Sequence, residues 1–204
     1  MKLTSLALTF LLFGSAGCTA TRLPAGLAEI QSRPIPKTPL ALSQELEVMV
    51  EIDQEARFAM MDAPEGNRPR IVRKLEVIDQ ANTERMRRIV DELGWPTISA
   101  YGEKTAHDAW LLVQHADAQP DFQRRCLELM APLLDKDEVR KDDYAYLTDR
   151  VLLAEGNPQI YGTQFHTVNG VLQPRPMVDP DNVDQRRKEM GMVSLEEYRT
   201  WFEK

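Results

Sequence analysis

Polar side chains interrupt the apolar stripes of several predicted helices, and these side chains are the first candidates for chemistry. Asp53 falls in the stripe of a first helix and Asn82 in that of a second. Gln114 and His115 end a third helix, and Asp117 follows directly. A buried polar group without a partner costs about 1–3 kcal/mol, so these groups must converge on one another, on water or on a ligand.

The same reasoning extends to the second half of the chain. Asp149 and Arg150 lie in a fifth predicted helix, and Tyr161 and Gln164 lie in a predicted hairpin region. Two interpretations of the whole set stay open. It is either an internal hydrogen-bond network that ties the helices to the hairpin, or the lining of a polar pocket.

His115 is the best candidate for proton transfer, because histidine titrates near neutral pH without help. Asp117 or Asp53 would orient its ring. The alternative is a helix cap, since a histidine at a helix end interacts favourably with the negative end of the helix dipole. His107 lies eight residues before His115, about 12 Å along a helix, too far to share one metal ion with it. His166 lies in the predicted hairpin region and not on this helix. We therefore expect no metal site and no cofactor.

The first residues resemble a secretion signal. Lys2 gives a positive start, residues 6–13 are mostly apolar, and Ser15-Ala16-Gly17 precede Cys18. This apolar run is too short to span a bilayer, which takes about 20 residues. The pattern resembles a bacterial lipobox, so we expect a signal peptide over 1–17 and lipidation of Cys18. Ordinary secretion, with Cys18 incidental, is the alternative.

Anchoring and charge together limit the partners. The expected location is the cell envelope, with the chain lipid-anchored to the outer membrane and facing the periplasm, because Thr19 rather than aspartate follows the cysteine. Cleavage removes one lysine and changes the formal charge from −7 to −8. An acidic domain without a basic cluster is not expected to bind nucleic acid. Cys126, at helical spacing from apolar residues, is interpreted as a small buried residue.

The remaining chain divides into a tether and one folded domain. Four prolines and little periodicity over 18–40 predict an extended tether that could reach up to ~60 Å. Residues 41–204 predict a mainly α, single helical domain with two short C-terminal helices. Asn169-Gly170 between apolar runs predicts a β-hairpin near 159–178. Ser194 and Glu197 form a capping box in the last helix. The five longer helices are expected at about 42–61, 71–93, 103–116, 120–134 and 144–152.

A set of short motifs resembles one bacterial family, catalogued as a domain of unknown function, number 6624. The resemblance covers about 42–200, and it supplies no activity. It implies that these polar positions are part of the family's pattern, which favours the pocket over the internal network. The motifs are Asp53-Gln54 with Arg57, Asp79 with Asn82, Gly94-Trp95-Pro96, residues 110–117 with Phe122-Gln123, residues 146–150, residues 159–164 and residues 183–187.

Three functions remain open. The first is a binding module whose polar pocket takes a small polar ligand or a peptide end. The second is a hydrolase or transferase that uses His115 as general acid and base, with Asp117 or Asp149 orienting it and Arg150 holding an anion. The third is an envelope interaction protein without a pocket. The sequence favours the binding module and does not decide whether the chain is an enzyme.

Overall fold

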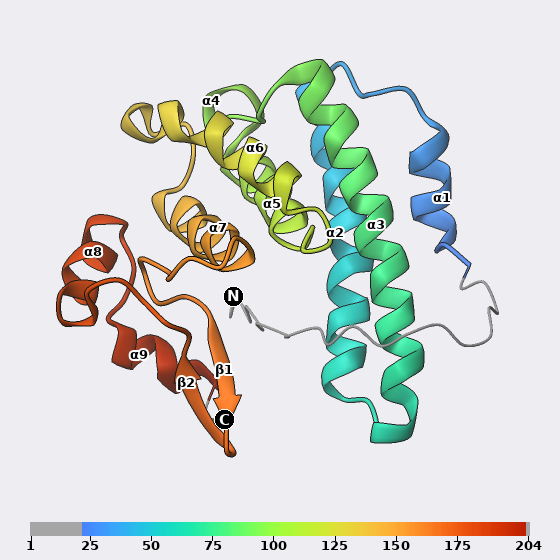
Figure 1. Ribbon diagram of the computed structural model, residues 1–204. Helices are drawn as coiled ribbons and strands as arrows, with labels where there is room; N and C mark the ends of the chain where they lie inside the picture. Colours follow the sequence, from blue (N-terminus) through green and yellow to red (C-terminus); the bar gives the residue numbers. More distant parts are fainter. Residues whose placement is uncertain (1–21, 203–204) are drawn as a thin grey trace. The chain divides into compact units, whose positions relative to one another are not determined.

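The computed structural model describes residues 22–202. It is mainly helical with one two-stranded antiparallel hairpin, which confirms the predicted fold class (Figure 1). The described residues form two compact units, residues 22–140 and residues 141–202. We call them the helical unit and the hairpin unit and describe each by itself. The expected signal peptide and lipidated Cys18 lie outside the described residues.

The helical unit is built on a long helical hairpin. Helices α2 (Pro39–Met61) and α3 (Arg68–Leu93) are joined by the short 3₁₀ turn η1 (Glu65–Asn67) and lie side by side (Figure 1). Helix α5 (Glu103–Gln114) packs against both. This helix is apolar on nearly every side, as is expected for a helix at the centre of the unit. The core between the three helices includes Leu42, Leu46, Met49, Ile78, Met86, Ile89, Leu112 and Val113.

Local chemistry sets the helix boundaries. Thr38 caps α2 by accepting from the amide of Ala41, with Pro39 at the first helical position. Gly94, at φ 76°, ends α3 where the sequence predicted it. The single helix predicted over 120–134 is instead α6 (Pro120–Met130) followed by the 3₁₀ turn η2 (Ala131–Lys136). Pro132 lacks the amide that an α-helix needs there. The short α4 (Ile98–Tyr101) precedes α5.

The predicted extended tether over 18–40 is wrong for residues 25–32, which form helix α1 (Ala25–Ser32). Leu27 is fully buried and Ile30 nearly so, and α1 packs against α2 and α3. Two apolar residues three positions apart provide this face, a pattern too short to stand out among the surrounding prolines. None of the helices in residues 22–202 combines the length and the hydropathy that a bilayer crossing demands.

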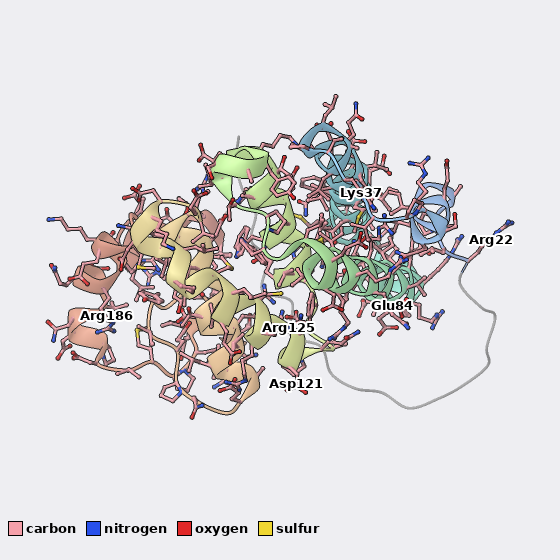
Figure 2. All side chains as sticks on the ribbon, turned by 90° about the horizontal axis from the view of Figure 1, so that it is seen from above. Arg22, Lys37, Glu84, Asp121, Arg125 and Arg186 are labelled. Carbon is pink, nitrogen blue, oxygen red and sulfur yellow. The ribbon has the colours of Figure 1, made fainter. Side chains whose placement is uncertain are left out.

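A buried arginine holds the segment that follows α1. Arg85 of α3 is fully buried, whereas its neighbour Glu84 lies at the exterior (Figure 2). Its guanidinium donates to both carboxylate oxygens of Glu45, at 2.7 and 2.9 Å. It also donates to the carbonyl oxygens of Arg33 and Pro34, at 2.8 and 3.0 Å. One cation therefore joins α2, α3 and the chain that leaves α1.

The hairpin unit begins with helix α7 (Lys141–Ala154). Strands β1 (Phe165–Val168) and β2 (Val171–Pro174) pair with Val168 opposite Val171. The turn residues Asn169 and Gly170 both have positive φ, 51° and 80°, as the predicted tight turn requires. The unit closes with η3 (Pro180–Asn182), α8 (Val183–Glu189), α9 (Leu195–Arg199) and η4 (Thr200–Phe202).

The C-terminal helix covers the hairpin by aromatic packing. Buried Tyr198 lies 5.8 Å from Phe165 and 5.0 Å from Phe202 between ring centroids. Ser194 caps α9 by accepting from the amide of Glu197, which is one of the two hydrogen bonds of the predicted capping box.

The buried pair Glu45–Arg85 should be far more important for stability than an exposed pair on the same helix. Glu45→Leu leaves a buried guanidinium unpaired and should lower the free energy of unfolding by about 3–5 kcal/mol. Glu47→Leu is the matched control, because Glu47 pairs with Lys104 at 51% and 61% side-chain exposure. It should cost less than about 1 kcal/mol. Urea denaturation of both variants measures the difference, and equal costs would contradict this account.

Candidate functional site

Asp53 is a fully buried carboxylate in the middle of α2. Its oxygens accept from Arg57, one helical turn later, at 3.2 and 3.1 Å from Nε and 3.1 Å from Nη2. Gln54 Nε2 donates to Oδ2 at 2.8 Å. The carboxylate is therefore surrounded by donors from its own helix, as a buried charge requires.

Arg57 connects three helices. Its Nη2 also donates to Asp79 Oδ1 of α3 at 2.5 Å, and its Nε lies 3.0 Å from His115 Nδ1. His115 is the residue at the C-terminal end of α5. Its Nδ1 also lies 3.1 Å from Asp53 Oδ2. We call Asp53, Arg57, Asp79 and His115 the polar cluster; the structure confirms that Asp53 and His115 meet.

The two contacts of His115 Nδ1 compete with each other. A ring nitrogen that carries hydrogen can donate to the carboxylate of Asp53, whereas one with a lone pair can accept from Arg57. It cannot do both at once. The same nitrogen thus faces an anion and a cation, and the position of the ring proton decides which contact is favourable.

The charges of the cluster stabilise one another. Burial alone would raise the pKa of Asp53, but His115 and Arg57 outweigh it and hold this pKa below its usual value. Burial alone would lower the pKa of Arg57, while Asp53, Asp79 and Asp117 raise it. Three carboxylates therefore favour the charged form of the Arg57 guanidinium.

Gln114 and Asp117 flank His115 in the sequence, and the side chain of Gln123 binds both of them. Gln123 of α6 donates to the carbonyls of Val113 and Gln114 at 3.2 and 3.0 Å, and to Asp117 Oδ1 at 3.3 Å. This amide satisfies the last carbonyls of α5, which otherwise have no partner in the helix. The end of α5, with His115, is thereby fixed.

Among the predicted site residues, Asn82 has a buried side-chain amide whose two polar atoms both lack a hydrogen bond within residues 22–202. The residue is 1% exposed. Three positions separate it from Asp79, so the two side chains lie on the same face of α3. Gln114 Oε1 is likewise buried without a hydrogen bond within this range. Such groups cost about 1–3 kcal/mol each unless something else binds them.

The remaining predicted residues lie in the hairpin unit, where they organise a loop. Asp149 is fully buried and accepts from the backbone amides of Ile160, Tyr161 and Thr163, at 2.7, 3.0 and 2.9 Å. Burial raises the pKa of the Asp149 carboxyl, and these amides act in the opposite sense. Tyr161 contributes its backbone to this arrangement.

Gln159 completes the loop. Its Oε1 accepts from the amide of Gln164 at 2.9 Å, and its Nε2 donates to the Gln164 carbonyl at 3.0 Å. The side chain of Gln159 therefore fixes the backbone of Gln164. Arg150 lies half-buried on α7, next to Asp149 in the sequence. Asp149, Tyr161 and Gln164 therefore lie close together, and their hydrogen bonds stabilise the loop over residues 159–164.

Two members of the polar cluster were absent from the predicted site. Arg57 and Asp79 entered only through the family resemblance, although Arg57 follows Asp53 by one helical turn and Asp79 precedes Asn82 by almost one. A metal site was also not expected, because no third ligand near His115 and Asp117 could be identified from the sequence. In the structure, ligand atoms of Asp53, Asp79 and His115 lie within 4.8 Å of one another.

Cys126 is fully buried in α6, as interpreted from its spacing. Burial raises the pKa of its thiol to about 12, so it is not a thiolate nucleophile near neutral pH.

Asp53→Asn should change how stability depends on pH. A carboxyl with a lowered pKa in the folded state stabilises the fold above the unfolded value of 3.8, and this stability is lost as pH falls below it. The variant should be less stable at pH 7 by about 1.5–3 kcal/mol. The difference in stability between the wild type and the variant should narrow as pH falls from about 4 to about 2, as measured by urea denaturation at each pH. A difference that stays constant with pH would contradict the charge interpretation.

Comparisons with known proteins give one finding. A family model described as a family of unknown function (DUF6624) matches residues 40–204. No curated protein and no solved structure matches the chain. Since the match covers most of the sequence and includes every member of the polar cluster, the chain belongs to this family of unknown function, DUF6624.

Proposed function

We propose that this chain is a lipid-anchored protein of the cell envelope that binds a small, positively charged polar ligand at the polar cluster. The anchoring part rests on the sequence: a basic start, a short apolar run and Ala16-Gly17 before Cys18. Membrane attachment then comes from acyl chains, each buried CH₂ contributing about 0.8 kcal/mol.

The binding part rests on Asn82. A buried amide with no protein partner in residues 22–202 is a cost to folding, and a ligand that accepts and donates hydrogen bonds would offset it. Its place on the same face of α3 as Asp79 puts it beside the cluster. Binding sites commonly combine apolar walls with a few such oriented polar groups.

The sign of the charge favours a cationic ligand. Asp53 and Asp79 both accept from the guanidinium of Arg57, and Asp117 is close enough to raise the pKa of Arg57. An ammonium group, as on an amino acid amide or the amino end of a peptide, would complement these carboxylates. The carboxylates would repel an anionic ligand. A peptide amino end agrees with the peptide-end alternative of the sequence analysis.

Asn82→Leu tests this proposal, because it should raise the stability of the ligand-free protein and should abolish stabilisation by the ligand. Without ligand the variant should be more stable by about 1–3 kcal/mol, since an unsatisfied amide is replaced by a side chain of similar size. Thermal-shift screening uses amino acid amides and peptidoglycan peptides with free amino groups. Wild type should be stabilised by at least one of them, and Asn82→Leu by none.

Glu84→Gln is the control, because Glu84 is exposed on the same helix. It should keep both the stability and the ligand response of wild type. A destabilised Asn82→Leu would show instead that Asn82 supports the fold, and the proposal would fall.

Proton transfer is the second candidate function, favoured by the 3.1 Å separation of His115 Nδ1 and Asp53 Oδ2. A carboxylate at Nδ1 orients the ring and supports the imidazolium that forms when the other nitrogen takes a proton. This arrangement suits a hydrolase or transferase. It requires the hydrogen of the neutral ring on Nδ1.

Chromogenic ester, amide and phosphate substrates test for hydrolysis. An active wild type should lose about 10²–10⁴-fold of its rate in His115→Gln. His107→Gln is the matched control and should keep full activity. Equal rates in the wild type and His115→Gln would remove this candidate.

A further inference from the structure

Three helices each bring one possible metal ligand to the same place. Asp53 comes from α2, Asp79 from α3 and His115 from the end of α5. Their ligand atoms lie within 4.8 Å of one another. Metal–ligand distances of about 2.0–2.2 Å place neighbouring ligand atoms about 3–4 Å apart, so a small inward movement would complete the geometry.

Arg57 shows that the three ligands already converge on a positive charge. Its Nη2 lies 2.5 Å from Asp79 and 3.1 Å from Asp53, and its Nε lies 3.0 Å from His115 Nδ1. The guanidinium therefore contacts all three candidate ligands at once. The competing contacts of Nδ1 are resolved when that lone pair and the carboxylates face one cation together.

Arg57 can leave this position more easily than the ligands can. Its side chain is 25% exposed, whereas that of Asp53 is fully buried and that of His115 is 12% exposed. Long arginine side chains rotate into solvent while their stems stay packed.

The ligand types indicate the class of metal. Imidazole suits zinc, copper, iron and nickel, while carboxylates suit harder ions, and a mixed set is typical of Zn²⁺. Three protein ligands leave a fourth position of a tetrahedral ion for another molecule. Buried Asn82, on the same face of α3 as Asp79, has the unpaired amide that could bind such a molecule.

We propose that Asp53, Asp79 and His115 bind a divalent transition-metal ion, with Zn²⁺ as the best fit, in exchange for the guanidinium of Arg57. This inference rests on the proposed function in one respect: both place a positively charged ligand at the polar cluster. The neutral His115 ring then binds through Nδ1 and carries its hydrogen on Nε2. The ion exchanges for Arg57 without any change in oxidation state.

Isothermal titration of tag-free, chelator-treated full chain with ZnCl₂ tests the site, with MgCl₂ as the comparison. Wild type should bind one Zn²⁺ and should not bind Mg²⁺ in the same range. Asp79→Asn and His115→Gln should weaken Zn²⁺ binding about 100-fold or more. His107→Gln and His166→Gln, at the other two histidines, should leave it unchanged.

Arg57→Gln gives the decisive result, because it should tighten Zn²⁺ binding by at least about tenfold once the competing cation is removed. It keeps the test valid even if a ligand variant fails to fold. No Zn²⁺ binding, weaker binding in Arg57→Gln, or loss of binding in His107→Gln or His166→Gln would overturn the metal site. If amine ligands still stabilise the wild type in that case, the proposed function stands without the metal.

Discussion

The helical unit depends on one constraint: the carboxylate of Asp53 is completely buried and must be neutralised where it lies. A charge withdrawn from water is tolerated only with close partners. Arg57, one turn later on α2, reaches it and continues to Asp79 of α3, while His115 arrives from α5. The three helices that form the apolar core are therefore also joined by one electrostatic network, and their packing and their chemistry cannot be changed independently.

A second buried cation uses the same principle for a different purpose. Arg85 also spans α2 and α3, but its donors are directed to Glu45 and to two backbone carbonyls. All of these partners belong to the fold, so Arg85 fixes the chain that leaves α1. The cluster around Arg57 differs because the two contacts of His115 Nδ1 compete with each other. In addition, the amide of Asn82, on the same face of α3 as Asp79, makes no hydrogen bond within residues 22–202. These differences separate a structural ion pair from a candidate site.

Much of the fold follows from local signals in the sequence. Gly94 marked the end of α3, and Asn169-Gly170 marked the hairpin turn, because both depend on positive φ. Helix α1 escaped prediction because two apolar residues among prolines form no periodic pattern. At the site, Asp53, Asn82 and His115 were recognised as polar interruptions of apolar stripes. Arg57 and Asp79 were not recognised, because each lies near the edge of an apolar stripe. The partners of such a charged residue can be identified only when the packing of the neighbouring helices is known.

The packing of α1 against α2 and α3 shortens the segment that separates the helical unit from Cys18. If Cys18 carries the lipid, as proposed, only the six residues from Thr19 to Pro24 separate it from the start of α1. Their greatest possible span is about 20 Å, roughly one third of what a fully extended 18–40 segment would allow. With a lipid on Cys18, a connection this short would confine the helical unit to the layer of water beside the lipid headgroups. Ligands would then be captured at the membrane surface, and ones attached deep in the periplasm would be out of reach.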